Sequence, residues 1–217
     1  MPDLSLSAVP LFAELNDDEL SEVEFRTKLR RYRKQTVIIE AGDETSTLYL
    51  LLSGRARVYV DDDAGKTLTL RELAPGDHFG ELALLGGTQR TASIVTLSDC
   101  EVRLLPGAAF QDLLVSSPRI ALHVMRHLAQ RVADLTDQLR DLGLLSSYQR
   151  IAKILTESAT PEDGRLITPP LTQQSLAERA RCSREMVSRI LSDLRTGDYL
   201  HQEGKRFVIL RKLPRRW

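Results

Sequence analysis

The stretch FGELALLGGTQRTA, residues 79–92, determines how the N-terminal half of the chain is interpreted. It places a glycine-rich turn before a short helix, followed by an arginine and a hydroxyl side chain. Backbone N–H groups at such a turn, with a guanidinium that binds two oxygens at once, suit an anionic phosphate. Gly80, Arg90 and Thr91 fit these roles, whereas the carboxylate of Glu81 suits a neighbouring ribose hydroxyl. The stretch therefore predicts a nucleotide site.

The residues around this stretch, from about 36 to 105, predict an antiparallel β-roll or barrel. Short apolar runs alternate with turn segments rich in glycine and aspartate. A short helix is expected before them, at about residues 17–24. The regular spacing of the runs favours an antiparallel roll. The clearest runs are Val37–Ile39, Leu48–Leu52, Arg57–Val60, Leu68–Leu70 and Val102–Leu105.

A heptad pattern over residues 118–145 predicts one long helix. A stripe this narrow is typical of helices that pair with a partner helix, so we expect it to form the contact of a homodimer. Ser146 or Ser147 is expected to cap the next helix, beyond a hinge. The apolar positions of the pattern, three and four residues apart in turn, are Met125, Leu128, Val132, Leu135, Leu139 and Leu142.

The C-terminal residues 146–217 predict a winged helix-turn-helix. Thr172 and Ser183 are typical N-cap residues of two helices joined by a tight turn. Residues 199–202 and 207–210 predict the hairpin of a wing. By helical periodicity the second helix has an apolar side and a polar side. The apolar side holds Val187, Ile190, Leu191 and Leu194, and the polar side holds Arg184, Glu185, Ser188 and Arg189.

The charge balance supports this division. The whole chain has 30 basic and 30 acidic residues. Residues 1–146 carry a net charge of −6, whereas residues 147–217 carry +6. A basic C-terminal segment suits a polyanionic partner such as double-stranded DNA.

Several other classes of protein are not expected. Two cysteines cannot form a disulfide framework or a four-thiolate metal site, and we expect a soluble protein of a reducing cytoplasm. No apolar run approaches the roughly 18 residues of a membrane span, so no membrane partner is expected. His123 and His127 lie one helical turn apart but have no evident third ligand, so no metal is expected. No nucleophile and base are spaced for catalysis, so the chain is not expected to be an enzyme.

Two segments resemble parts of a known family. Residues 79–92 resemble the phosphate-binding cassette of cyclic-nucleotide-binding domains, in the form Phe-Gly-Glu-Leu, a small loop, and Arg-Thr-Ala. Residues 182–189, CSREMVSR, resemble the recognition helix of the cyclic-AMP receptor protein and FNR family of bacterial transcription regulators. With the long helix and the wing in the same order, the resemblance covers nearly the whole chain.

The resemblance implies an α+β fold and a cyclic-AMP-responsive, sequence-specific DNA-binding regulator that acts as a homodimer. The implied parts are a cyclic-nucleotide-binding β-roll of the jelly-roll type at 1–117, a dimerisation helix at 118–145 and a winged helix-turn-helix at 146–217. In the ligand site, Arg90 and Thr91 are implied to hold the cyclic phosphate. Gly80 and Glu81 are implied to hold the ribose, with Leu82 in the same set.

For DNA, the resemblance implies that Arg184, Glu185 and Arg189 read a TGTGA-like half-site of an inverted repeat. Arg can donate twice to guanine and Glu can accept from cytosine, which fits these roles. RNA polymerase is a further expected partner. The remaining expected DNA contacts, most of them near phosphates, are Thr172, Gln174, Ser183, Ser188 and Lys205.

The chain departs from the family at the ligand base. Leu135 and Thr136 stand where the cyclic-AMP receptor has a Thr-Ser pair that grips adenine, and Leu135 cannot make that hydrogen bond. The cassette is also one residue shorter between Gly80 and Arg90. Cyclic AMP is the favoured ligand, and cyclic di-GMP is its main competitor. A DNA-binding regulator that needs no ligand and a nucleotide-binding module that touches no DNA stay open as alternatives.

Overall fold

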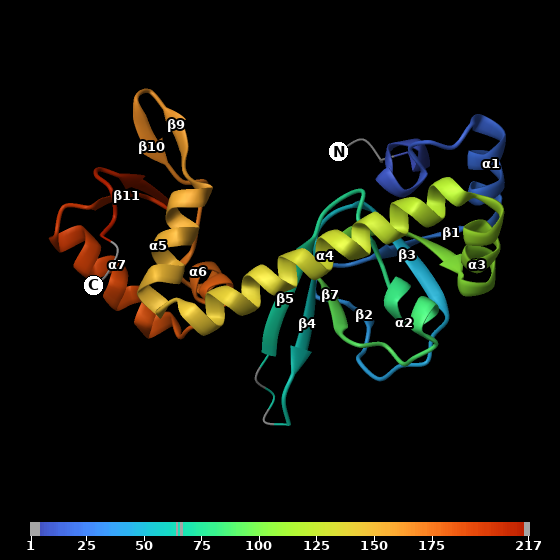
Figure 1. Cartoon of the computed structure of the whole chain (residues 1–217), viewed down its shortest axis with the longest axis horizontal. Coiled ribbons are helices and arrows are strands. Elements are labelled where there is room, and N and C mark those ends of the chain that lie inside the picture. Colours follow the sequence, from blue (N-terminus) through green and yellow to red (C-terminus); the bar gives the residue numbers. More distant parts are fainter. Residues whose placement is uncertain (1–4, 64, 66, 215–217) are drawn as a thin grey trace. The chain divides into compact units, whose positions relative to one another are not determined.

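The computed structural model describes residues 5–63, 65 and 67–214, and the chain divides into two compact units (Figure 1). The first unit spans residues 1–130 and the second spans residues 131–217. The first consists mainly of antiparallel sheets and the second contains a helix-turn-helix, with the long helix α4 (Pro118–Leu144) shared by both. The α+β fold expected from the sequence is confirmed.

The described part of the first unit contains two four-stranded antiparallel sheets. One has the order β1-β8-β3-β6 and the other has the order β2-β7-β4-β5. The strands are β1 (Lys28–Tyr32), β2 (Val37–Ile39), β3 (Thr47–Ser53), β4 (Ala56–Asp61), β5 (Thr67–Leu73), β6 (His78–Phe79), β7 (Ser93–Thr96) and β8 (Cys100–Pro106).

Strand β3 is buried on both faces. Leu48, Leu50 and Leu52 belong to a core cluster that includes side chains of the surrounding helices, whereas Tyr49 and Leu51 belong to a second cluster formed with residues of the other sheet. A strand buried on both faces needs a continuous apolar run instead of an alternating pattern. This explains why residues 48–52 are all large and apolar.

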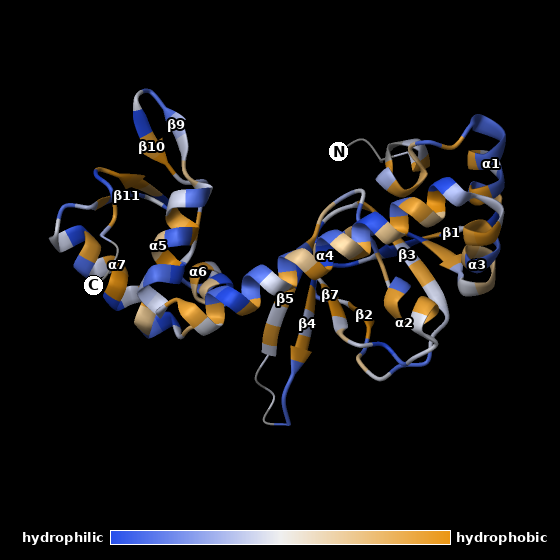
Figure 2. Cartoon of the chain, viewed as in Figure 1, coloured by the Kyte–Doolittle hydropathy of each residue, from blue (hydrophilic) through white to orange (hydrophobic). Residues whose placement is uncertain are grey.

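The helices of the first unit complete the first core cluster. Val23, Phe110 and Val124, from three different helices, pack in this cluster with Leu50. The helix α1 begins with a capping box at Asn16. Along α4 the hydropathy colours alternate, as expected for a helix with an apolar and a polar side (Figure 2). The helices that precede α4 are the short 3-10 helices η1 (Leu6–Ala8) and η2 (Pro10–Phe12), then α1 (Asp17–Arg26), α2 (Glu81–Gly86) and α3 (Gly107–Ser116).

Where the structure describes it, up to residue 214, the second unit has three helices and a four-stranded sheet in addition to the end of α4. Ser146 caps the first of these helices through a capping box, which confirms one of the two caps expected there. The expected wing hairpin is present, but a second hairpin joins it, and the sheet order is β11-β12-β10-β9. The elements are α5 (Ser147–Ser158), β9 (Thr160–Glu162), β10 (Arg165–Ile167), α6 (Gln173–Ala180), α7 (Arg184–Thr196), β11 (Leu200–Glu203) and β12 (Arg206–Ile209).

Thr96 connects β7 to the turn between β1 and β2, and we expect its hydroxyl to stabilise the first unit. Its Oγ1 accepts a hydrogen bond from the N–H of Thr36 at 2.8 Å and donates to the carbonyl of Arg33 at 2.7 Å. Thr96→Val keeps the shape of this buried side chain and removes both hydrogen bonds. The free energy of unfolding of the first unit should fall by about 1–3 kcal/mol.

Urea unfolding followed by hydrogen exchange in β7 measures this loss. The matched control is Thr67→Val, which alters an exposed threonine on the edge strand β5 and should change stability by less than about 0.5 kcal/mol. Equal stability of Thr96→Val and the unaltered chain would contradict the role given to this hydroxyl.

Candidate functional site

The stretch predicted to bind phosphate, residues 79–92, runs from the end of β6 through α2 to the residue before β7. Gly80 is the residue before α2 and has a φ angle of 88°. A Cβ atom at this position would lie 2.6 Å from Nη1 of Arg90 and 3.0 Å from the carbonyl oxygen of Thr47. Both the backbone conformation and the close packing therefore require glycine. The first turn of α2 begins directly beside Arg90.

Arg90 is almost fully buried and donates hydrogen bonds to three separate acceptors. Its Nη1 donates to the carbonyl of Gly80 at 2.6 Å, and its Nη2 donates to the carbonyl of Thr47 at 2.7 Å. Its Nε donates to the hydroxyl of Thr45 at 3.1 Å. Since a guanidinium has five N–H donors, these bonds fix its plane and leave further donors for an anion. The structure therefore holds the guanidinium in one position, beside the start of α2.

Charges and an aromatic ring around Arg90 offset the cost of burying it. Burial lowers the pKa of the guanidinium, and the nearby groups of Tyr49, Glu81 and Asp43 act in the opposite direction. The guanidinium lies over the ring of Tyr49, 5.7 Å from its centre. That ring stacks on Phe79 at 5.1 Å. Arg90 therefore remains a cation whose position is fixed from several sides.

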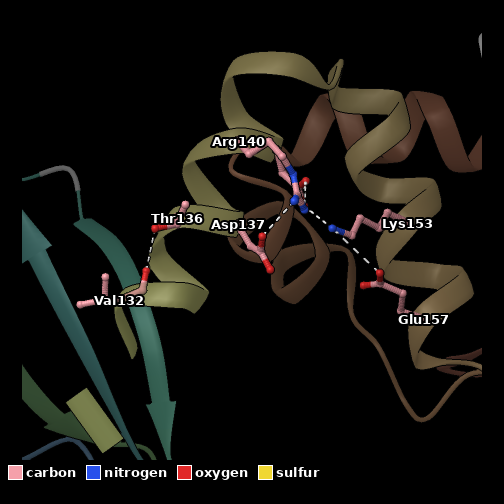
Figure 3. Close-up of polar contacts among 7 residues, drawn as sticks. Val132, Thr136, Asp137, Arg140, Lys153 and Glu157 are labelled. Atoms are coloured by element: carbon pink, nitrogen blue, oxygen red, sulfur yellow. Dashed lines mark hydrogen bonds and ion pairs between the residues drawn. The ribbon is translucent and has the colours of Figure 1, made fainter. Parts of the chain in front are cut away.

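The other expected ligand residues differ in their exposure. Glu81 is buried in the first turn of α2, whereas Leu82 and Thr91 are exposed. Leu135 and Thr136 lie on the part of α4 that belongs to the second unit, and both are exposed there. The hydroxyl of Thr136 donates to the carbonyl of Val132 at 2.8 Å (Figure 3), so in this structure its proton is used within the helix.

Three histidines come together near the cassette, a grouping that the sequence did not predict. His78 on β6 is buried, and its ring centre lies 4.5 Å from that of His127 and 6.4 Å from that of His123. No spacing in the sequence indicates this pairing, because β6 and α4 meet only through the fold. Among the described residues, no group of three potential ligands has a geometry that could hold a metal ion.

The helix pair α6 and α7 forms the candidate DNA-binding surface. The predicted apolar side of α7 is buried, with Val187, Ile190, Leu191 and Leu194 in the core of the second unit. The four polar residues of the opposite side, Arg184, Glu185, Ser188 and Arg189, are all exposed. The core thus fixes the helix while the polar side chains predicted to contact DNA lie on its exposed side.

Capping groups hold the starts of both helices. The Thr172 hydroxyl accepts a hydrogen bond from Ser175 N at 3.0 Å, and the Ser183 hydroxyl accepts one from Met186 N at 3.2 Å. The pKa of Glu185 is lowered by its own backbone N–H and by Ser183. Its carboxylate therefore lies close to the start of α7, where the helix dipole favours a negative charge.

Two further expected DNA contacts lie on the surface of the second unit. Gln174 is exposed on α6, and its Nε2 donates to Glu178 at 2.9 Å. Lys205 is exposed in the turn between β11 and β12, and its carbonyl accepts a hydrogen bond from the N–H of Leu171 at 2.7 Å. This bond joins the tip of the wing to the segment before α6.

Among the helices of the described residues, none is long and apolar enough to cross a membrane.

Comparisons with known families match both units. The model of the cyclic nucleotide-binding domain matches residues 29–117, and the model of the Crp-like helix-turn-helix domain matches residues 149–215. Together the matched residues span most of the chain.

Curated relatives and solved structures agree with these matches. The chain is 34% identical to the cAMP-activated global transcriptional regulator CRP of Pasteurella multocida over 83% of this chain and 89% of the relative. It is 32% identical to the cAMP-activated global transcriptional regulator Vfr of Pseudomonas aeruginosa over 83% and 88%. The structure of the c-di-GMP responsive global regulator CLP of Xanthomonas campestris matches with a TM-score of 0.75 at 26% identity, covering 89% of this chain and 99% of that one. The chain therefore belongs to the cyclic-AMP receptor protein family of cyclic-nucleotide-binding, DNA-binding transcription regulators.

Proposed function

We propose that the chain forms a homodimer that binds an inverted-repeat operator and that cyclic AMP is its allosteric effector. The observation that carries this proposal is the position of Arg90, which is buried, cationic and held beside the start of α2. A charged side chain is rarely buried unless its environment compensates it, and here the remaining donors are available to an anionic ligand.

The roles proposed for the ligand residues follow from their chemistry. The cyclic phosphate accepts from Arg90 and Thr91 and from backbone N–H groups at the start of α2. Glu81 accepts from the ribose 2′-hydroxyl, and Gly80 and Leu82 line the same turn. The curated relatives described above, from Pasteurella multocida and Pseudomonas aeruginosa, are named as cAMP-activated, which favours cyclic AMP.

Two alternatives have specific support. A regulator named as c-di-GMP responsive has a similar structure, and Leu135 lacks the hydroxyl that would help to hold adenine, which together favour cyclic di-GMP as the second candidate ligand. The three hydrogen bonds that Arg90 already makes to the protein favour a third candidate, a DNA-binding regulator that functions without a ligand.

The homodimer is supported by the apolar stripe of α4. Its outward residues are largely exposed in the single chain, with exposed fractions between 40% and 71% for Met125, Val132, Leu135, Leu139 and Leu142. A row of large apolar residues at heptad spacing is stabilised when a second helix covers it. Pairing of two such helices gives the two-fold symmetry that an inverted-repeat operator requires.

In the proposed complex, Arg184, Glu185 and Arg189 read the bases of a TGTGA-like half-site in the major groove. Contacts to phosphates set the register without reading the sequence, and they are assigned to Thr172, Gln174, Ser183 and Lys205. Ser188 is a further DNA contact, on the polar side of α7. Control of transcription then places RNA polymerase among the partners. Cyclic AMP acts by binding the DNA-competent state more tightly than the other state.

We expect Arg90→Lys to weaken cyclic AMP binding by about 10- to 100-fold, because a lysine keeps the charge but cannot bind two oxygens in a plane. Isothermal titration of nucleotide-free protein measures the loss, and circular dichroism verifies that the variant is folded. Gln89→Ala, which alters the exposed neighbouring residue, is the matched control and should bind within threefold of the unaltered chain.

Three results would change this assignment. Equal binding by Arg90→Lys and the unaltered chain would contradict the phosphate role of Arg90. Heat of binding with cyclic di-GMP alone would identify that nucleotide as the ligand. No heat with either nucleotide would favour the regulator without a ligand.

We expect Arg184→Ala and Arg189→Ala each to weaken operator binding by about 1–3 kcal/mol and to relax the preference at one guanine. Fluorescence anisotropy with operators mutated at single positions measures both effects. Arg119→Ala removes an exposed guanidinium from the other unit and should leave affinity and preference unchanged. A uniform loss on all sequences would instead assign these two arginines to phosphate contacts.

A further inference from the structure

The joint between α4 and α5 is short and has little intrinsic rigidity. Only Leu145 and Ser146 separate the two helices. Gly143 lies in the last turn of α4, and nothing lies within 4 Å of where its Cβ would be. Glycine within a helix lowers the stability of that helix relative to alanine. The backbone alone would therefore allow α4 to bend relative to the DNA-binding helices at this point.

An ion pair spans this joint. Asp141 Oδ2 on α4 lies 2.5 Å from Lys153 Nζ on α5 (Figure 3 shows Lys153 with its neighbours). Arg140 adds a second cation, 3.0 Å from Asp137 and 3.7 Å from Asp141. Glu157 lies farther from Lys153, at 3.9 Å. The hydrogen bond to Asp141 is the main cause of the raised pKa of Lys153, so Lys153 stays charged at neutral pH.

Two arginines connect the same region to the turn before the recognition helix. Arg150 donates to the carbonyl of Leu145 at 2.6 Å and to the carbonyl of Ala180 at 2.7 Å. The Arg181 side chain donates to Gln138 on α4 at 2.8 Å. Arg181 is also the residue that ends α6, with a left-handed φ of 50°. Its side chain therefore binds α4 while its backbone forms the turn that leads to α7.

We propose that the Asp141–Lys153 ion pair and the Gln138–Arg181 hydrogen bond form a latch. The latch fixes the last turns of α4 to the helix-turn-helix, so that residues 131–217 move as one body. Its groups line a cavity of about 230 Å³, where water and salt can reach them. Each of these contacts is therefore weak by itself and can be released.

This latch changes where the hinge is expected. With the latch closed, the chain does not turn at Ser146, and a change in the packing of the α4 stripe reaches α7 through Arg181. The compact second unit, which begins at Arg131, agrees with this because it includes the end of α4. The latch itself follows from these contacts within the second unit, and only its effect on DNA binding rests on the proposed function.

Hydrogen exchange of the full chain, without ligand or DNA, tests the latch. We expect Asp141→Asn and Lys153→Met each to speed the exchange of peptides that cover residues 138–150 by about three- to tenfold. The double variant should exchange no more than twofold faster than the faster single variant, because each change removes the same pair. Glu157→Gln is the matched control, since it removes only the 3.9 Å contact, and it should stay within twofold.

Two outcomes would overturn the proposal. One is exchange in both single variants within twofold of the unaltered chain. The other is a double variant in which the two effects multiply, as they do for independent residues. Because the measurement uses neither nucleotide nor DNA, its failure is distinguishable from failure of the proposed function.

Discussion

The hydrogen bonds of the Arg90 guanidinium determine the rest of the ligand site. They connect the loop before β3, through Thr45 and Thr47, to the start of α2 at Gly80. This contact excludes any side chain at Gly80 and keeps the start of α2 beside a fixed cation. Under the proposed function, an anionic ligand therefore meets a guanidinium whose position is already fixed by the protein.

The sequence predicted those parts of the molecule that depend on local patterns. Ser146, Thr172 and Ser183 are helix caps, as their residue types indicate. The apolar side of α7 is buried as its periodicity predicts. Residues 79–92 and 182–189 carry the resemblance to the family, because their residue types themselves supply the chemistry.

Other parts could not be predicted, because they depend on contacts between distant residues. Strand β1 has no buried residue, and four of its five side chains are basic or aromatic. It therefore lacks the alternating pattern of a typical strand, and it is defined by its pairing with β8. The β9 strand is fully exposed and is likewise defined by its pairing with β10. The position of His78 against α4 follows from the packing of β6, which spans two residues.

The proposed function links a nucleotide site in one unit to a DNA-binding helix in the other. It requires that nucleotide binding controls the affinity for DNA. The most direct test is the affinity for a duplex with two TGTGA half-sites as an inverted repeat, measured by fluorescence anisotropy with and without saturating cyclic AMP at constant salt. The account predicts that cyclic AMP raises the affinity by at least about tenfold, equivalent to about 1.4 kcal/mol. Equal affinities in the presence and absence of the bound nucleotide would contradict it.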